Sequence, residues 1–583
     1  MTAPNRNTLW AEVFVDELAA AGVGAVCIAP GSRSTPLTVA FANRDDVRVF
    51  SHLDERSAAF FALGRGRLTG RPTPVVCTSG TAAANLHPAV LEASESRVPL
   101  VLLTADRPPE LWESGANQTT NQERLYGGAV RWYRTLPEPE PEDRKLRSLR
   151  VTAGRAVAEA TGCPAGPVHL NVPFRKPLEP VPVEDDIPPE FEADASLAVG
   201  GRDGPFVSRA RGRPELSGSG IERVQEAVAG TDRGLVICGP ANRPTPSRDA
   251  LAALAEATGF PVFADPLSGH RFGHEDVPVC GGYDSYLAAP EAVPTPELVV
   301  RFGASPTSKE LRKFLSESVP RQFLVDPAGG WREAEFAATD LVEADPTAFA
   351  ERLVAGLSPG PTVYRDRMLE VERQYWDHVE TACAAEFFEG AVLRAVVDGC
   401  PDPATVFVSN SMPVRDLDRF GRPAAADLTV LGNRGVSGID GVTSTALGAG
   451  SATDDPLVAV VGDLAFYHDM NGLLAVERCG VDATIVLVDN DGGGIFHKLP
   501  IEGFDPPFTE QFRTPHGLDL SRVGELYDIS FVDVSETDAL TDSVASSTRR
   551  DGTQVLHVET DAESSHRFRE TLHEEVCASL ARE

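Results

Sequence analysis

The sequence predicts an α/β protein made of three Rossmann-like domains, each built on a parallel sheet. Apolar runs of strand length recur along all 583 residues and alternate with helix-length segments. This alternation is typical of βαβ units with parallel strands. The chain is also too long for a single hydrophobic core, so about three domains are expected.

Two stretches without hydrophobic periodicity divide the chain. Residues 183–218 are rich in Pro, Asp, Glu and Gly, and a short Pro/Gly run occupies 358–361. Both compositions are typical of linkers. We therefore expect a first domain over 1–182, a linker over 183–218, a central domain over 219–357 and a third domain over 358–583.

The first domain is expected to contain several strands that each run into a polar turn and then a helix; these strands are 25–29, 47–53, 74–77, 98–104 and 167–173. The turn after the first strand contains Arg33, flanked by Ser32 and Ser34. Either serine could cap the following helix. A positive charge is unfavourable at a helix N-terminus, so we interpret Arg33 as facing an anionic ligand.

The central domain repeats the alternation, with expected strands at 235–238, 261–264, 297–302 and 322–325. Gly239-Pro240 follows the first of these strands and is not a Gly-x-Gly-x-x-Gly fingerprint. No dinucleotide is expected there, and we predict a structural role for this domain.

The third domain carries the most informative stretch of the chain. LVAVVGD (457–463) and ATIVLVDN (483–490) flank a helix-length segment, and a glycine run follows at 492–494. A right-handed crossover brings the ends of both strands to one sheet edge, so Asp463 and Asn490 are expected to lie close together. A carboxylate, a carboxamide and free carbonyls form an oxygen ligand set that suits Mg²⁺ beside a phosphate.

This stretch resembles the diphosphate-binding motif of thiamine diphosphate enzymes, which reads Gly-Asp-Gly, a spacer and Asn. Here it reads Gly462-Asp463-Leu464, so a leucine replaces the second glycine. The alternative interpretation is an ordinary strand that ends in aspartate.

Four long runs near the amino terminus extend the resemblance to one family. They are APGSRSTPLT (29–38), HLDERSAAFFALG (52–64), TSGTAAANLHPAV (78–90) and TADRPPELWESGANQT (104–119). They resemble the 2-succinyl-5-enolpyruvyl-6-hydroxy-3-cyclohexene-1-carboxylate synthases of menaquinone biosynthesis. The resemblance implies a pyrimidine-binding, a central and a diphosphate-binding domain, and decarboxylation of 2-oxoglutarate followed by addition to isochorismate.

The resemblance also assigns roles to individual residues. Glu55 would activate the thiamine pyrimidine as the catalytic residue. Thiamine diphosphate would contact Glu55 and the following positions: Gly80, Ile439, Gly462, Asp463, Leu464, Asn490, Gly492, Ile495 and Phe496. Asp463, Asn490 and the carbonyl of Gly492 would hold Mg²⁺, with Mn²⁺ as an alternative ion.

Substrate recognition would fall to a set rich in cationic and polar side chains: Ser32, Arg33, Arg107, Asn117, Gln118, Lys309, Ser411, Arg415 and Arg434. The two substrates together bring four carboxylates, and arginine binds carboxylates in a bidentate manner. A surface lysine explains Lys309 equally well. Ile495 and Phe496 could anchor their loop in the core, form a wall against the cofactor, or do both.

The net charge of the chain excludes some classes of binding partner. The formal net charge is −33 and is spread along the sequence, so nucleic acid and anionic membranes are poor ligands. We interpret the charge as adaptation to high salt, which screens self-repulsion. The nine cysteines form no Cys-x-x-Cys pair, so neither disulfides nor a zinc site is expected.

The remaining expectations concern place and assembly. No apolar run is long enough to span a membrane, and the amino terminus lacks a signal pattern, so a cytoplasmic enzyme is expected. The resemblance implies active sites between subunits of a homodimer or a dimer of dimers. Two alternatives stay open: another thiamine diphosphate carboligase or 2-oxo acid decarboxylase, such as an acetohydroxyacid synthase, and a catalytically inactive binding or scaffolding homologue.

Overall fold

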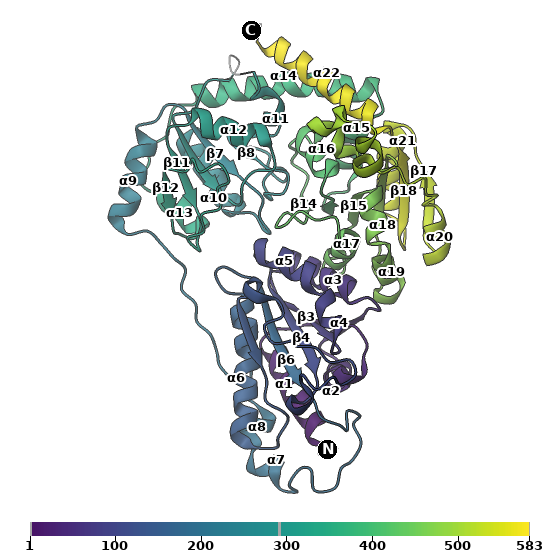
Figure 1. Cartoon of the computed structure of the whole chain (residues 1–583). Coiled ribbons are helices and arrows are strands. Elements are labelled where there is room, and N and C mark those ends of the chain that lie inside the picture. Colours follow the sequence, from purple (N-terminus) through teal and green to yellow (C-terminus); the bar gives the residue numbers. More distant parts are fainter. Residues whose placement is uncertain (1–2, 290–292, 582–583) are drawn as a thin grey trace. The chain divides into compact units, whose positions relative to one another are not determined.

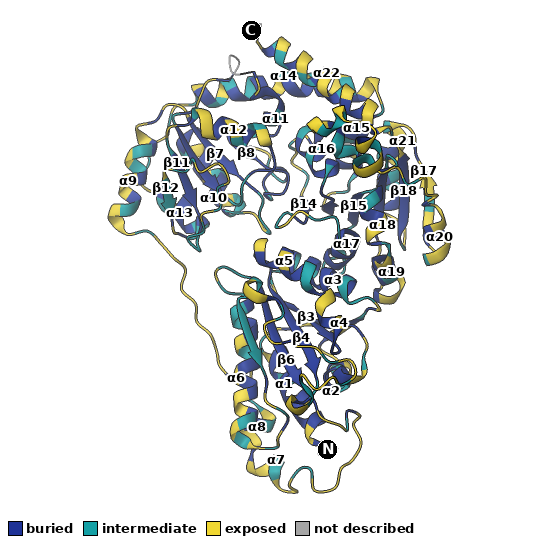
Figure 2. Cartoon of the chain, viewed as in Figure 1, coloured by how far each residue is buried: buried dark blue, intermediate teal, exposed yellow. Residues whose placement is uncertain are grey.

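The computed structural model describes residues 3–289 and 293–581 and contains three six-stranded sheets (Figure 1). Every strand pairing in the described ladders is parallel. The strands are mostly buried and the helices expose one side, as Figure 2 shows. The predicted fold of three Rossmann-like parallel-sheet domains is confirmed.

The first sheet has the order β2-β1-β3-β4-β6-β5. Its strands are β1 (Ala25–Ile28), β2 (Arg48–Ser51), β3 (Thr73–Cys77), β4 (Leu100–Asp106), β5 (Trp132–Thr135) and β6 (Pro167–Pro173). Its main helices are α1 (Arg6–Ala20), α2 (Thr35–Ala42), α3 (Glu55–Thr69), α5 (His87–Glu95) and α6 (Asp143–Ala160). The strand order reverses between β1 and β3, and open α/β sheets bind ligands at such a switch point.

The second sheet has the order β12-β11-β10-β7-β8-β9. Its strands are β7 (Gly234–Cys238), β8 (Val262–Ala264), β9 (Val279–Cys280), β10 (Leu298–Phe302), β11 (Gln322–Val325) and β12 (Asp340–Val342). The helices of this region are α9 (Gly218–Ala229), α10 (Arg248–Thr258), α11 (Tyr283–Tyr286), α12 (Lys309–Ser318), α13 (Pro346–Val354) and α14 (Val363–Ala385).

The third sheet has the order β14-β13-β15-β16-β18-β17, which repeats the order of the first. Its strands are β13 (Ala404–Val408), β14 (Leu428–Leu431), β15 (Leu457–Gly462), β16 (Thr484–Asp489), β17 (Ser530–Asp533) and β18 (Gln554–Glu559). The long helices are α15 (Glu389–Gly399), α16 (Met412–Phe420), α17 (Val442–Gly450), α21 (Thr537–Ser547) and α22 (Ala562–Leu580). Its switch point lies between β13 and β15.

Two predicted segments differ in detail from expectation. The crossover from β15 to β16 is not one helix but three short pieces, α18 (Asp463–His468), η4 (Met470–Leu473) and α19 (Leu474–Cys479). Gly472 lies at the break, and glycine is a poor helix former. The stretch 183–218 contains two short helices, α7 (Phe191–Asp194) and α8 (Ser196–Gly200).

The chain divides into two compact units. The first comprises the chain up to Arg211 together with 433–454 and 469–481; the second comprises 212–432, 455–468 and 482–583. Two segments that flank strands of the third sheet therefore belong to the first unit.

A close crossing of α3 and α17 builds part of the first unit. A Cβ atom at Gly64 would lie 2.0 Å from the carbonyl oxygen of Thr445, and one at Gly448 would lie 2.0 Å from that of Phe61. Only glycine permits this approach of two backbones. The crossing holds the segment that follows Ile439 against the helix that begins at Glu55.

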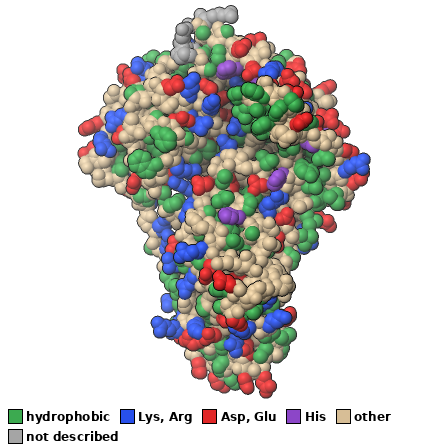
Figure 3. Space-filling view, viewed as in Figure 1, with side chains coloured by type: hydrophobic (Ala, Val, Ile, Leu, Met, Phe, Trp, Pro, Cys, Tyr) green, Lys and Arg blue, Asp and Glu red, His purple; other side chains and the backbone are tan. Residues whose placement is uncertain are grey.

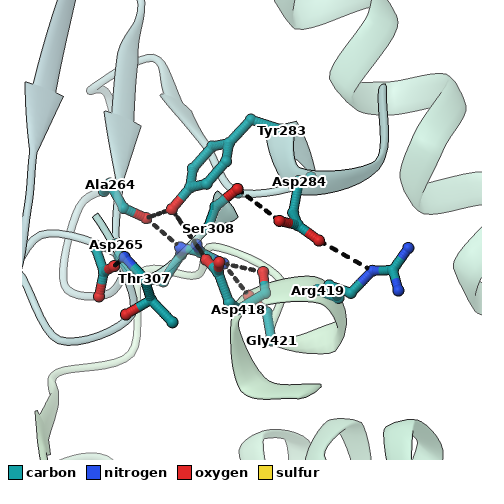
Figure 4. A network of polar contacts seen from close by, with 12 residues as sticks. Ala264, Asp265, Tyr283, Asp284, Thr307, Ser308, Asp418, Arg419 and Gly421 are labelled. Atoms are coloured by element: carbon teal, nitrogen blue, oxygen red, sulfur yellow. Dashed lines mark hydrogen bonds and ion pairs between the residues drawn. The ribbon is translucent and has the colours of Figure 1, made fainter. Parts of the chain in front are cut away.

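A buried polar network joins the central and third domains within the second unit (Figure 4). Arg271 donates to Ala264 O at 2.6 Å, to Asp418 Oδ1 at 2.8 Å and to the Tyr283 hydroxyl at 3.0 Å. Removing one partner of such a buried pair leaves an uncompensated charge, so the network resists local change. It fixes α16, whose first residues include candidate site positions.

None of the described helices combines the length and the apolar character that a membrane span requires. All nine cysteines are free thiols, and most of them are buried.

Candidate active site

Candidate residues of the first unit gather where β1, β3 and β4 end. Ser32 begins the short helix η1 (Ser32–Ser34) directly after β1 and is exposed. Arg33 is buried, and its Nη1 donates to Phe174 O at 2.7 Å. Arg107 follows the last residue of β4. The predicted edge of the sheet is therefore the place where these side chains lie.

Arg33 and Arg107 both lie near one buried carboxylate, that of Asp106. Burial lowers the pKa of Arg33, and the charge of Arg107 lowers it further, whereas Asp106 opposes the shift. Asp106 accepts from Asn171 Nδ2 at 2.8 Å and from the backbone N–H of Arg107 at 2.7 Å. The Nε atoms of both arginines are buried without a hydrogen-bond partner in the described chain. Two guanidinium groups beside one carboxylate leave surplus positive charge, which suits an anionic ligand.

The polar loop after β4 folds back onto the turn after β3. Gln118 Nε2 donates to Ser79 O at 3.2 Å, and Ser79 Oγ donates to Gln118 O at 2.9 Å. Arg107 Nη2 donates to Asn117 O at 2.9 Å. Gly80 has φ +89°, which only glycine adopts without strain, and a Cβ there would lie 3.2 Å from Gln118 Cγ.

Gln122 holds this loop and is absent from the predicted set. Its Oε1 accepts from Gly80 N at 2.8 Å, and its Nε2 donates to Asn171 Oδ1 at 2.8 Å. A single glutamine in a polar loop carries no sequence signal, so only the fold identifies it.

Glu55 is the first residue of α3 and is half-buried. Asp54 caps this helix by accepting from Arg56 N at 2.8 Å and Ser57 N at 3.4 Å. Burial raises the pKa of Cys77 at the end of β3, and the nearby charge of Glu55 adds to that shift. Glu55 therefore lies close to the end of β3.

The loop that carries Arg434 and Ile439 belongs to the same unit. Buried Glu92 on α5 accepts from the backbone N–H groups of Gly435 at 2.8 Å and Val436 at 2.7 Å. Arg434 and Ile439 are both half-buried. Glu92 was not predicted from the sequence, because a glutamate within a helix resembles any surface residue.

Candidate residues of the second unit gather where β15 and β16 end. Asp463 follows Gly462, the last residue of β15, and accepts from Leu464 N at 2.6 Å and Gly492 N at 2.7 Å. Burial raises the pKa of Asp463 to about 6, although both N–H groups oppose the shift. Gly492 has φ +141°, a backbone conformation that favours glycine at this position.

Asn490 lies at the end of β16. Its Nδ2 donates to Glu389 Oε1 at 2.7 Å, and its Oδ1 is buried without a partner in the described chain. The oxygens of Asp463, Asn490 and Gly492 are hard donors from neighbouring strand ends, so this set fits Mg²⁺.

A second group shares Asp463. Ligand atoms of Asp463, Asp489 and His516 lie within 4.8 Å of one another, and His516 Nε2 is 3.2 Å from Asp463 Oδ2. Burial would raise the pKa of Asp489, but a hydrogen bond from His557, one from the backbone N–H of Asp491 and the nearby histidine charges together lower this pKa below its usual value. The contact of His516 was not foreseen, since it lies far along the chain in a loop without a motif.

The apolar pair after the glycine run lies in the 3₁₀ helix η5 (Gly494–Lys498). Ile495 and Phe496 are both half-buried, and the Phe496 ring meets that of Phe512 edge to face at 5.4 Å. The contact anchors Phe496, while part of each side chain remains exposed. This is compatible both with a loop anchored in the core and with a wall against the cofactor.

Ser411 and Arg415 lie at the start of α16. Ser411 has φ +69°, and Arg415 Nη1 donates to Ser411 O. Lys309 is exposed at the start of α12. The preceding residue, Ser308, donates to Asp284 Oδ1 at 2.5 Å, and Asp284 pairs with Arg419 at 3.4 Å (Figure 4). The contacts around Lys309 do not distinguish a surface lysine from a substrate contact.

The predicted residues divide between the two compact units. One comprises Ser32, Arg33, Glu55, Gly80, Arg107, Asn117, Gln118, Arg434 and Ile439. The other comprises Lys309, Ser411, Arg415, Gly462, Asp463, Leu464, Asn490, Gly492, Ile495 and Phe496. Each group lies within one compact unit.

Comparison with known proteins identifies the family. Residues 9–125 match the thiamine pyrophosphate enzyme N-terminal TPP binding domain, 221–408 match the middle domain, and 421–558 match the C-terminal TPP binding domain. A 2-succinyl-5-enolpyruvyl-6-hydroxy-3-cyclohexene-1-carboxylate synthase of Haloarcula marismortui is 59% identical over 100% of both chains. The chain belongs to this synthase family. The resemblance predicted from the sequence motifs is confirmed.

Other relatives and structures agree. Synthases of the same name from Halobacterium salinarum and Roseiflexus castenholzii are 61% and 46% identical, over 99% of both chains and over 96% and 97% of the two chains respectively. A 4-hydroxybenzoylformate decarboxylase of Rhodococcus jostii has a TM-score of 0.70 at 18% identity, covering 95% of this chain and 99% of its own. At that identity the likeness concerns the fold alone. Several relatives come from halophilic archaea, which agrees with the predicted salt adaptation.

Proposed function

We propose that the chain decarboxylates 2-oxoglutarate and adds the resulting succinyl unit to isochorismate. The products are 2-succinyl-5-enolpyruvyl-6-hydroxy-3-cyclohexene-1-carboxylate and CO₂, in menaquinone biosynthesis. The observation that carries the proposal is full-length similarity, at 59–61% identity, to relatives with this name. Two candidate substrate arginines, Arg33 and Arg107, lie together at one sheet edge, which supports it.

Asp463, Asn490 and the Gly492 carbonyl would hold Mg²⁺, which in turn would bind the diphosphate. The unpartnered Oδ1 of Asn490 supports this assignment, because a buried acceptor without a donor is costly unless a ligand satisfies it. Mn²⁺ accepts the same oxygen ligands and could replace Mg²⁺. Asp489 and His516 form a mixed oxygen and nitrogen alternative, which a hard ion favours less.

Thiamine diphosphate, when bound, supplies the carbanion for the reaction. Glu55 would hold a hydrogen bond to the pyrimidine ring, and that bond is strong where water is excluded. Arg33, Arg107, Arg415, Arg434 and Lys309 would neutralise substrate carboxylates, helped by polar side chains at Ser32, Asn117, Gln118 and Ser411. Ile439, Ile495 and Phe496 would form apolar walls, with Gly80 and Leu464 beside the cofactor.

We further propose a cytoplasmic homodimer or dimer of dimers whose active sites form between subunits. The family resemblance supports this assembly, because pyrimidine-binding and diphosphate-binding residues belong to different domains of the chain.

The test is product analysis by mass spectrometry with thiamine diphosphate, Mg²⁺ and 2-oxoglutarate, with and without isochorismate. The adduct should form only when isochorismate is present. A Glu55→Gln variant should bind the cofactor but turn over about 100- to 1,000-fold more slowly, the loss expected for one electrostatic stabiliser.

Two outcomes would contradict the proposal. CO₂ release without adduct would favour another carboligase or a 2-oxo acid decarboxylase. Absence of cofactor binding in a calorimetric titration with Mg²⁺ would favour a binding or scaffolding homologue.

A further inference from the structure

The carboxamide of Asn490 has a contact that the cofactor motif does not explain. Glu389, the first residue of α15, is 2% exposed and accepts from Asn490 Nδ2 at 2.7 Å through Oε1. Thr560 Oγ1 donates to the same oxygen at 3.4 Å. The oxygen of the carboxamide has no partner in the described chain.

Glu389 belongs to a buried ionic cluster. Arg569 on α22 donates through Nη2 to the second carboxylate oxygen of Glu389. Arg569 also forms a two-pronged pair with Asp416 on α16, with both contacts at 2.7 Å. Arg569 is 3% exposed and Asp416 is 1% exposed. Arg569 can only donate, so the Glu389 oxygen that it contacts is a hydrogen-bond acceptor, as is the oxygen that Thr560 contacts.

Both Glu389 oxygens accept hydrogen bonds, whereas a carboxamide has one donating and one accepting end. A carboxylate at 2.7 Å therefore selects the NH₂ end of Asn490. The opposite orientation would place two oxygens against each other in a buried site. The oxygen of Asn490 must then point away from Glu389.

We propose that Glu389 is a positioning residue that fixes the orientation of the Asn490 carboxamide and so keeps its oxygen available to the divalent cation. The proposal deepens the proposed function and rests on it. Arg569 acts one step further away, since its hydrogen bond orients the Glu389 carboxylate. The C-terminal helix α22 thereby supports the metal site without supplying a ligand.

Glu389→Gln is the discriminating variant, because it preserves shape and changes only the donor pattern. Arg569 can only donate, so it will take the oxygen of the introduced carboxamide and turn the new NH₂ group toward Asn490. Asn490 must then rotate its own oxygen toward that NH₂ group and away from the metal. Mn²⁺ affinity, measured with saturating thiamine diphosphate by the electron paramagnetic resonance of free Mn²⁺, should fall at least ~10-fold, as expected when the outer-shell partner of a metal ligand is lost.

Two further variants separate orientation from charge. Asp416→Asn is the matched control: it removes one carboxylate from the same arginine but does not contact Asn490. Its Mn²⁺ affinity should stay within about 3-fold of the wild-type value, well short of the loss expected for an outer-shell partner. The double variant Glu389→Gln/Asn490→Asp should regain most of the lost affinity, because a carboxylate at position 490 accepts from the introduced amide and still offers its other oxygen.

Each result decides the matter. Wild-type protein that binds no Mn²⁺ with the cofactor would overturn the proposed function itself. Wild-type binding with equal affinity in Glu389→Gln, an equal loss in Asp416→Asn, or no recovery in the double variant would overturn the positioning role alone. If Glu389→Gln does not fold, Glu389→Asp takes its place: it keeps the charge but withdraws the acceptor, and an unchanged affinity would contradict the proposal.

Discussion

At the scale of single residues, the burial of His169 in its neutral form makes the unfolding free energy depend on pH. His169 on β6 is fully buried, with Nε2 2.7 Å from Thr104 Oγ1 and its ring edge-on to Tyr126. Burial lowers the pKa of His169 to about 3. The unfolded chain takes up this proton near pH 6.5. The contribution of neutral His169 to the unfolding free energy is therefore fully present above that pH and is lost as pH falls toward 3.

Replacing this histidine should flatten the acid limb of the stability curve. Between about pH 6.5 and 5, His169 should cost the wild-type protein about 2 kcal/mol of unfolding free energy, and His169→Gln should lack this loss. Urea unfolding at fixed KCl concentration, compared at both pH values, gives the difference. Parallel pH profiles for the two proteins would rule out His169 as the source.

Residues of the candidate site differ in how far the sequence reveals them. Asp463 and Asn490 end two apolar runs, and parallel strands must end at one edge, so their proximity follows from topology. Gln122, Glu92 and His516 lie in loops or helices, and no local sequence motif indicates that they contact site residues. Each acts by a hydrogen bond that exists only after folding.

At the scale of elements, strand prediction depended on burial. Strands β6 and β11 match their predicted bounds, and both are buried along their whole length. Edge strands β5 and β17 escaped prediction, since their residues are mostly polar or partly exposed. Strand β18 was not predicted either, although all of its residues except Glu559 are buried.

The close crossing of α3 and α17 predicts that glycine-to-alanine substitutions at two positions have opposite effects on stability. Gly64→Ala should destabilise the protein by about 1–3 kcal/mol, because the new methyl group would overlap the Thr445 carbonyl. Gly154→Ala in α6 is the control: its Cβ would lie 3.6 Å from Glu17 Oε1, an ordinary contact. That change should stabilise by about 0.5–1 kcal/mol through helix propensity.

Thermal denaturation of the two glycine variants in the same buffer is the measurement. A melting temperature that falls for Gly64→Ala and rises or holds for Gly154→Ala supports the close crossing. Equal shifts in both variants would show that helix propensity alone governs these positions.

At the scale of the whole molecule, the sequence predicts three sheets but not which segments pack together. Residues 433–454 and 469–481 lie beside strands of the third sheet in the sequence, yet they belong to the first compact unit. Periodicity shows that a helix has an apolar face and does not identify the partner of that face. The close glycine contacts of α17 appear only once both helices are placed.

The acidic surface should make the melting temperature depend on salt concentration. The net charge is −33, and acidic side chains are spread across the face shown in Figure 3 rather than gathered in one patch. Like charges at this density destabilise the compact state through self-repulsion. Salt shortens the range of that repulsion from about 10 Å at ~0.1 M to about 3 Å at ~1 M. The melting temperature should therefore rise steeply from low to molar KCl.

Charge variants test whether repulsion is the cause. Exchanging exposed Glu222, Glu256 and Glu317 for glutamine should raise the low-salt melting temperature and reduce its dependence on KCl. Exchanging exposed Arg223 for glutamine should do the reverse, because it removes a compensating cation. If KCl stabilised all of these proteins equally, specific ion binding or strengthened hydrophobic burial would account for the effect, since neither depends on the number of surface charges. A weaker KCl dependence in the glutamate variants together with a stronger one in the Arg223 variant follows from the change in net charge.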